Sequence, residues 1–379
     1  MLLRLPGLSL LAALVLPGTL HAQVTEFVST LGTDTVYVER FTITGPSAEG
    51  VLLRHSPRAI ITLYSIALNA NGSLAKFTQL TTNADGSTLA TGSMPLVMTF
   101  SGDSVFREIQ QNGAAVTLRS AAPRGTLPAF GASTVFAQQM IQMAMGGRDV
   151  YTIGFGPQAT AGKADIRFIS RDSVEIVNGG FRTGYRVAPD GRILRGDGSL
   201  TTQKFIVTPR TGVNLDAIAS AWAARDAAGL AMGAASTRDT LHAGVGNVHV
   251  ILDYGRPAKR GREIWGKLVP FDTTWRFGAN AAAQLRIDRA MEIGGTTIPA
   301  GFYSLYLLPS AGQSFLIVNA QTGQWGTVYD ATKDVARIPV ETQPMRAVSE
   351  ERFKVSIEGD RLLMTWDRGG YSVRVREPQ

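Results

Sequence analysis

Alternating apolar and polar residues dominate the chain from Thr35 to about Arg210. The segments VYVERFTI (36–43) and AIITLYSIAL (59–68) are rich in β-branched and aromatic residues, which favour strands. Glycine next to Asn or Asp recurs between such segments and supplies the positive φ that tight hairpins need. These pairs are Asn71-Gly72, Asp85-Gly86, Gly102-Asp103, Asn112-Gly113, Asp190-Gly191 and Asp197-Gly198. We therefore predict a β-rich domain at residues 23–212, built as a curved, half-barrel-like antiparallel sheet.

A helical pattern interrupts these strands at residues 134–145. Its apolar side chains recur at helical spacing on one face, at Phe136, Met140, Met143 and Ala144. Ser133 is placed to cap the start of the helix, and Gly146-Gly147 to end it. We expect this helix to cover the open face of the curved sheet. Its methionines then either fill the core or line a cavity for an apolar ligand.

A second helix is predicted at 215–229, capped by Asn214 and carrying a narrow apolar stripe, within a helical linker at 213–240. Short strands return after the linker and follow one another closely: VHVILDYG, QLRI, FYSLYLL, SFLIV, RFKVSI, RLLMTW and YSVRVR. Such a series, without a long helix, is typical of a β-sandwich or jelly-roll. The sequence thus predicts a mainly β protein with a C-terminal β-sandwich domain at 241–379.

The first residues have the order of a secretory signal peptide. Arg4 precedes the apolar run Leu8–Leu16, Pro17-Gly18 breaks it, and Ala22 is the small residue at the expected cleavage point. The run of nine residues is shorter than the ~20 needed to cross a bilayer. We therefore expect cleavage after Ala22, export to the periplasm or beyond, and no integral membrane segment after processing. The chain has no cysteine, so its domains fold without disulfides.

Charge and composition argue against nucleic acid as a partner. The chain carries a net charge of +7, and seven of its 37 basic residues are lysine. Because the arginines are scattered singly along strands rather than clustered with aromatic residues, we do not expect nucleic-acid binding. Weak attraction to an anionic envelope polymer is compatible with this charge.

The sequence contains no recognisable catalytic or metal-binding constellation. Glycoside hydrolysis needs two facing carboxylates, and no spacing singles out a pair among Asp253, Glu263, Asp272, Asp330 and Asp334. No nucleophile elbow accompanies the histidines that remain after cleavage, which are His55, His242 and His249. On a regular strand, His249 faces away from the apolar side formed by Val248, Val250 and Leu252. We therefore expect no metal and no cofactor, and the sequence favours a non-catalytic protein over an enzyme.

The C-terminal region carries six ordered motifs. They are Asp253-Tyr-Gly-Arg-Pro257, Lys259-Arg-Gly-Arg-Glu-Ile-Trp-Gly266, Leu268-Val-Pro270, Trp275-Arg-Phe-Gly-Ala-Asn280, Ile298-Pro-Ala-Gly-Phe-Tyr-Ser-Leu305 and Gln324-Trp-Gly326. From Val245 to Arg376 this succession resembles the bacterial family known as domain of unknown function 2911. The resemblance implies architecture and export rather than an activity. One departure is Gly278-Ala-Asn-Ala-Ala-Ala283, where the family pattern implies Gly-Ala-Asn-Glu-Ala-Thr.

These motifs supply a set of polar and aromatic ligand-binding candidates: Tyr254, Arg256, Arg262, Trp265, Trp275, Arg276 and Asn280. Gathered on one rim, they suit a glycan, an anionic polymer or a small anionic ligand. Alternatively, arginines stacked on tryptophans hold long loops in place. On a regular strand Trp275 enters the core and Arg276 reaches the rim, because neighbours alternate between faces.

Three functions remain open after these considerations. The first is a non-catalytic exported binding protein for an envelope component or small ligand. The second is a hydrolase acting on envelope polymer or glycan, with the C-terminal domain as its catalytic unit. The third is a periplasmic carrier of an apolar molecule held by the N-terminal sheet.

Overall fold

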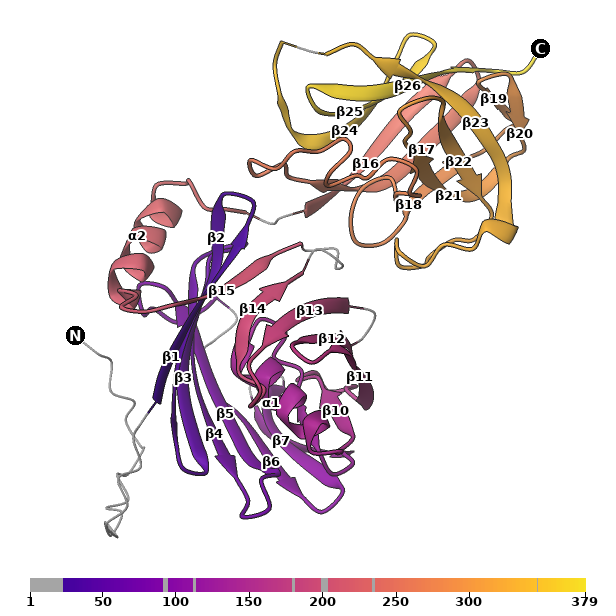
Figure 1. The fold of residues 1–379 in the computed structure, drawn as a ribbon. Helices are drawn as coiled ribbons and strands as arrows, with labels where there is room; N and C mark the ends of the chain where they lie inside the picture. Colours follow the sequence, from indigo (N-terminus) through magenta and orange to yellow (C-terminus); the bar gives the residue numbers. More distant parts are fainter. Residues whose placement is uncertain are drawn as a thin grey trace.

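A computed structural model of the chain describes residues 23–90, 95–111, 114–178, 181–198, 204–233, 236–345 and 347–379. Strands make up most of these residues, which confirms the mainly β class, and they form two large sheets (Figure 1). The predicted signal peptide at 1–22 lies outside the described residues. Within them, no helix combines the length and the apolar character needed to cross a membrane.

The N-terminal sheet contains fifteen strands. The first eight are β1 (Gln23–Leu31), β2 (Asp34–Thr44), β3 (Ser47–Arg54), β4 (Ile60–Leu68), β5 (Leu74–Asn83), β6 (Leu96–Ser101), β7 (Ser104–Gln111) and β8 (Ala114–Ala121). The others are β9 (Thr126–Pro128), β10 (Val150–Ile153), β11 (Ala161–Ser170), β12 (Ser173–Asn178), β13 (Phe181–Val187), β14 (Ile193–Asp197) and β15 (Ile206–Arg210).

The order of these strands makes a curved sheet with two separate edges. Successive strands are neighbours from β1 to β8 and again from β9 to β15, and β1 pairs with β15 to join the two series. The strands β8 and β9 are therefore the two ends of the sheet. Gly72, Gly86 and Gly191 have positive φ in turns between strands, as their pairing with Asn or Asp predicts. The pair Asn112-Gly113 lies outside the described residues.

Helix α1 (Thr134–Met145) lies in the concave face of this sheet (Figure 1). Phe136, Met140 and Met143 are buried there, as predicted. The predicted cap is wrong in one respect, because the Ser133 side chain makes no capping bond. Its hydroxyl donates instead to buried Glu39 of β2 at 2.6 Å, and Glu39 accepts the backbone N–H of Thr134. The Glu39 carboxyl group thus takes the place of the missing cap, because it accepts an N–H of the first helical turn.

Helix α2 (Leu215–Ala227) packs elsewhere on the N-terminal sheet, beside β2 and β3. Asn214 caps it, as predicted, by accepting the N–H of Ala217 at 3.0 Å. Trp222 is buried and stacks on His55 with ring centroids 4.3 Å apart. The predicted linker extends too far, because Ser236 already begins a strand that pairs along its length with the next one. The division into domains stays a prediction.

Eleven strands form the C-terminal sheet. Those of the first half are β16 (Ser236–Val245), β17 (Val248–Pro257), β18 (Ala283–Ile287), β19 (Met291–Ile293), β20 (Thr296–Ile298) and β21 (Gly301–Leu308). Those of the second half are β22 (Ser314–Asn319), β23 (Asp334–Gln343), β24 (Glu350–Glu358), β25 (Arg361–Asp367) and β26 (Gly369–Arg376), with the short 3-10 helix η1 (Ala331–Lys333) before β23.

This sheet curls until it nearly closes on itself. The strand β24 lies beside β16 and β17, and the Tyr254 hydroxyl of β17 accepts the N–H of Val355 in β24 at 3.0 Å. One continuous apolar core fills the interior of this sheet. The strands pack around a single centre, as the two layers of a β-sandwich pack around theirs. Val248 and Val250 point into this core, whereas His249 is exposed. The predicted orientation of His249 is confirmed.

Candidate functional site

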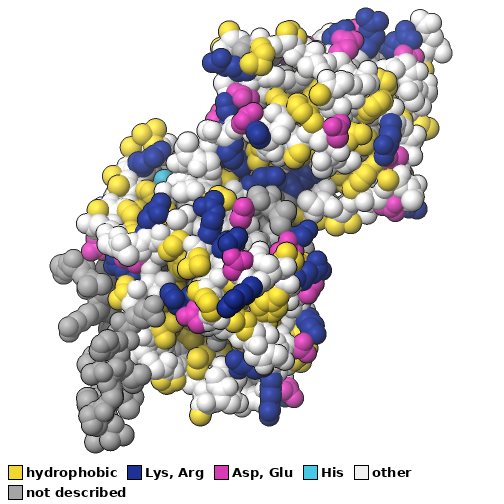
Figure 2. Space-filling model, viewed as in Figure 1, with side chains coloured by type: hydrophobic (Ala, Val, Ile, Leu, Met, Phe, Trp, Pro, Cys, Tyr) yellow, Lys and Arg dark blue, Asp and Glu magenta, His cyan; other side chains and the backbone are white. Residues whose placement is uncertain are grey.

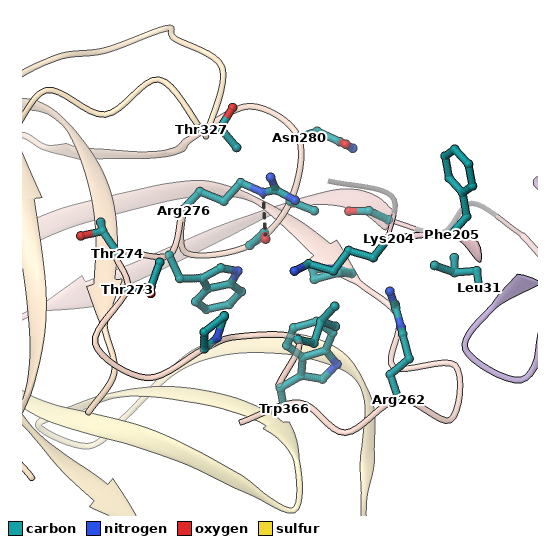
Figure 3. A pocket seen from close by; sticks show the side chains of 18 of the residues that line it. Leu31, Lys204, Phe205, Arg262, Thr273, Thr274, Arg276, Asn280, Thr327 and Trp366 are labelled. Atoms are coloured by element: carbon teal, nitrogen blue, oxygen red, sulfur yellow. Dashed lines mark hydrogen bonds between the residues drawn. The ribbon is translucent and has the colours of Figure 1, made fainter. Parts of the chain in front are cut away.

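A cavity of about 800 Å³ lies where the two sheets meet. The N-terminal sheet contributes residues near the β1–β2 turn and Lys204-Phe205 before β15. The C-terminal sheet contributes two loops, the connection from β17 to β18 and the segment near Gly326. Figure 2 shows Lys and Arg side chains gathered at this junction, and Figure 3 shows the lining from close by. We call this space the cationic cavity.

Arg260 holds the two sheets together beside the cavity. Its side chain is buried at 8% exposure and pairs with Asp34 of β2 at 3.0 Å. The same guanidinium donates to the carbonyl oxygens of Met232 and Gly233 at 3.1 and 3.3 Å. Its backbone N–H donates to Glu351 of β24 at 2.9 Å. Because one buried arginine contacts β2, the segment after α2 and β24, it fixes how the two loops face the N-terminal sheet.

The segment from Trp275 to Asn280 is an irregular loop rather than a strand. Trp275 makes only an isolated bridge to Leu307, and Phe277, Gly278 and Asn280 all have positive φ. The alternation assumed from the sequence therefore does not apply, and Trp275 and Arg276 both line the cavity. Trp275 also packs on the core residue Phe353, with ring centroids 5.0 Å apart.

Arg276 is positioned by a glycine on the facing loop. A Cβ added to Gly326 would lie 2.4 Å from Cδ of Arg276 and 2.6 Å from the carbonyl oxygen of Asn280. The N–H of Gly326 donates to that same carbonyl at 2.9 Å. Only glycine allows this close approach, which places the Arg276 guanidinium over the cavity (Figure 3).

Three half-buried cations line the cavity: Lys204, Arg262 and Arg276. Burial lowers the pKa of Arg276 to about 10. Burial, with a smaller effect of Arg260, also lowers the pKa of Arg262 to about 10. The pKa of Lys204 is lowered first by burial and then by Arg276 and Arg262, against an opposing effect of Asp197. The three groups therefore share one poorly solvated space, in which the two arginines disfavour the charge of Lys204.

The remaining lining combines aromatic faces with hydroxyl groups. Trp275, Trp366, Tyr306 and Tyr329 contribute rings from the C-terminal sheet. Threonine hydroxyls come from Thr273, Thr274 and Thr327. The described residues that line the cavity include no aspartate and no glutamate. The cavity can therefore offer cations, hydroxyl donors and ring faces, but no carboxylate, to a bound molecule.

The structure brings four of the seven predicted candidates to this cavity, namely Arg262, Trp275, Arg276 and Asn280. The other three do not line the cavity and make contacts within the C-terminal sheet. Tyr254 is buried in the core. Arg256 pairs with Asp239 at 2.9 Å. Trp265 donates its indole N–H to the Trp366 carbonyl at 3.1 Å and meets Trp275 edge to face.

Sequence reasoning missed the contribution of the N-terminal sheet. Lys204, Phe205 and Tyr37 belong to the lining, and none of them stands in a motif. A partial signal existed for Gly326, because it ends the motif Gln324-Trp-Gly326. Lys204 shares the cavity with two arginines that lie about 60 and 70 residues later in the chain. This proximity arises where the two sheets meet, and no local sequence pattern encodes it.

A second cavity of about 930 Å³ lies between α1 and the concave face of the N-terminal sheet. Its apolar lining comes from both sides, with Phe136, Ala137 and Met140 on α1 and Leu52, Ile60 and Ile176 on strands. Phe130 and Phe155 add rings from the loops. Polar groups are also present, among them Gln79, whose amide oxygen is buried with no hydrogen-bond partner among the described residues. We call this space the α1 cavity.

The acidic residues considered for catalysis are dispersed. Asp253 pairs with Arg238, Asp330 caps η1 through the N–H of Thr332, and Asp334 pairs with Arg337 at 2.9 Å. Across the described residues, no group of three or more His, Asp or Glu side chains is placed to hold a metal ion. The described lining of the cationic cavity contains none of these five acidic residues.

Comparison with known proteins identifies the C-terminal region. Residues 236–375 match the family described as "Protein of unknown function (DUF2911)", which confirms the resemblance seen in the motifs. The match starts at Ser236, where β16 begins. No curated protein matches the chain. Among solved structures, the crystal structure of a DUF1089 family protein from Pseudomonas aeruginosa is 14% identical and covers 43% of this chain and 90% of its own, with a TM-score of 0.32.

Proposed function

We propose that this protein is a non-catalytic binding protein for an anionic small molecule, held in the cationic cavity. The observation that carries the proposal is the placement of Lys204, Arg262 and Arg276 in one cavity whose described lining has no carboxylate. Arg262 and Arg276 are half-buried, and they donate hydrogen bonds to backbone carbonyl oxygens. A bound anion would add the opposite charge that these groups favour in a poorly solvated space, so binding and stability are linked.

The lining also indicates the kind of anion. Arginine donates paired N–H groups to a carboxylate or phosphate, and the half-buried ring of Trp275 offers a face to an organic body. Threonine hydroxyls at the rim can bond further oxygens. An organic carboxylate or phosphate therefore fits better than a bare inorganic ion. The hydrolase alternative finds no carboxylate pair among the described residues of this lining.

A titration of organic anions against the purified protein tests the proposal. Trp275 and Trp366 line the cavity, so tryptophan fluorescence reports its occupancy. Arg276→Gln removes one cation at similar length, and we expect affinity to fall about 10- to 100-fold, as loss of a charged hydrogen bond implies. The matched control is Arg289→Gln, because Arg289 is exposed and lies outside the lining. Equal affinities for both variants would refute the assignment of the cavity.

The affinity also depends on pH in a defined direction. Arg262 and Arg276 have pKa values of about 10, so they lose their charge as the pH rises through that value. Anion affinity should therefore be constant near neutral pH and fall as the pH approaches 10, well before a solvated arginine would titrate.

Export belongs to the same proposal. The charged residue, apolar run and small residue at 1–22 support cleavage after Ala22, which places the binding protein in the periplasm or outside the cell. Mass spectrometry of the exported protein should then give Gln23 as its first residue. A mature protein that keeps Leu8–Leu16 would contradict this.

A further inference from the structure

The cationic cavity and the α1 cavity adjoin each other at one pair of aromatic residues. Tyr37 of β2 and Phe205, just before β15, line both cavities, and among the described residues they are the ones common to the two linings. Their rings meet edge to face, with centroids 6.5 Å apart. Both side chains are only partly buried. Tyr37 and Phe205 therefore form a wall that the two spaces share.

The residues that line the two cavities differ in polarity. Lys204 precedes Phe205 directly, so a cation stands at the wall on the side of the cationic cavity (Figure 3). Beyond the wall, Phe130, Phe136 and Met140 present apolar surface. Arg54, which lies opposite Tyr37 in the β2–β3 register, and Lys163 are exposed cations in the lining of the α1 cavity. The cationic cavity therefore suits an anion, and the side of the α1 cavity formed by Phe130, Phe136 and Met140 suits an apolar chain.

We propose that the two cavities together hold a single amphiphilic anion. Its carboxylate or phosphate head lies among Lys204, Arg262 and Arg276, and its apolar chain passes Tyr37 and Phe205 into the α1 cavity. The inference rests on the proposed function for its anionic end and goes beyond it by naming the ligand class. Each methylene that leaves water for an apolar surface raises affinity about fourfold, so chain length becomes the measure of occupancy of the α1 cavity.

Gly162 of β11 offers a way to fill the α1 cavity without touching the cations. It lines that cavity, and a Cβ added there would meet no atom within 4 Å. Gly162 lies two residues before Ala164, which is buried in the core beside α1, so a side chain at 162 faces the same side of the sheet. Gly162→Trp should therefore occupy the space meant for the chain. Gly244→Trp is the matched control, because Gly244 of β16 has equal room and lies outside both cavities.

The experiment titrates lipid-stripped protein with four probes below their micelle concentrations: dodecanoate, hexanoate, dodecyl phosphate and dodecanol. We expect both dodecyl anions to bind at least 100-fold more tightly than hexanoate, because six methylenes are added. We also expect dodecanol to bind at least 10-fold more weakly than dodecanoate, because it lacks the charge. The tighter of the two dodecyl anions identifies the head group. Gly162→Trp should remove the chain-length advantage and leave hexanoate within twofold, whereas Gly244→Trp should change neither.

The outcomes separate this inference from the function on which it rests. If hexanoate and dodecanoate bind equally and Arg276→Gln weakens both, the anion site stands and the amphiphile is overturned. If dodecanol binds as well as dodecanoate and Arg276→Gln has no effect, both the anion site and the assignment of an amphiphilic anion are refuted. A chain-length advantage that survives in Gly162→Trp also overturns the inference, because the chain then lies outside the α1 cavity.

Discussion

The two sheets of this protein enclose their interiors in different ways. The C-terminal sheet nearly closes, and large side chains such as Tyr254, Phe277, Phe353 and Trp366, each at most 2% exposed, fill it. The N-terminal sheet stays open between β8 and β9, and α1 lies in its concave face above a cavity of about 930 Å³. A closed sheet filled by aromatic residues leaves only its loops for binding, whereas an open sheet keeps space in its interior.

The two sheets also differ in where they place charged residues. The C-terminal sheet keeps Arg262 and Arg276 on loops at its end, where they face the junction. The N-terminal sheet buries Glu39 at 2% exposure beneath the start of α1. Three donors satisfy that carboxylate, from Tyr64, Ser133 and the backbone of Thr134. One sheet thus places its cations on loops at the junction, and the other buries a carboxyl group whose hydrogen bonds hold a helix.

The largest effect is expected in the closed core. Phe353 is fully buried and meets Tyr254, Trp275 and Phe277 edge to face. Phe353→Ala should lower the free energy of unfolding by ~3–5 kcal/mol, measured by urea titration. Phe302→Ala on the same sheet should cost less than about 1 kcal/mol, because Phe302 is exposed and meets mainly Arg286. Similar costs for the two variants would show that the closed core is not tightly packed.

The next effect concerns the carboxylate that holds α1. Glu39→Gln places an NH₂ group against at least one donor, so we expect a loss of ~1–3 kcal/mol in the free energy of unfolding. Burial raises the pKa of Glu39 above its ordinary value. The folded state therefore keeps this proton to higher pH than the unfolded chain does. The contribution of Glu39 to stability is complete below about pH 4.5 and is lost as the pH rises through the raised pKa.

Thermal unfolding from pH 4.5 upward measures that linkage. The parent protein should lose the Glu39 contribution along the series, and Glu39→Gln should lack this component. If the two proteins show the same slope against pH, Glu39 is not the group that titrates.

The last two variants add side-chain volume, one in each sheet, and they compare the two interiors most directly. The smallest effect is expected in the N-terminal sheet. Ala283 of β18 is fully buried in the closed core, so Ala283→Leu should cost ~1–3 kcal/mol by overpacking. Gly162→Leu adds a larger group beside the α1 cavity and should stay within about 0.5 kcal/mol of the parent, because its Cβ meets open space. Unfolding of both variants in urea measures the difference. A large cost at Gly162 would contradict the open interior.

Local patterns predicted much of the fold. Both helices begin at the expected residues, Thr134 and Leu215, since capping residues and apolar periodicity act within one or two turns. The Asn-Gly and Asp-Gly turns are local for the same reason. The polar residues Ser236–Thr240 resemble a linker in the sequence, but they form a strand by pairing with β17. A polar edge strand has little pattern of its own.

The candidate site also has features that the sequence predicts and features that it does not. Residues of one loop, such as Trp275, Arg276 and Asn280, could be named from motifs because they are near in sequence. Their orientation could not, since positive φ at Phe277 and Asn280 turns the loop away from strand geometry. Tyr254 and Trp265 carry the same residue types as a binding rim, yet they serve the core and its edge. Residue type alone does not distinguish a ring that packs from a ring that binds.

The sequence by itself determined where strands, turns and helices form, the mainly β class and the similarity of residues 236–375 to a family of unknown function. These properties depend on neighbours a few residues apart, which alternation, capping and turn chemistry record directly. Only the tertiary structure decided that β15 pairs with β1 and that Lys204 meets Arg262 and Arg276. It also decided that Tyr37 and Phe205 stand between two cavities. Such contacts join distant segments through the packing of whole sheets, and no short stretch of sequence contains both partners.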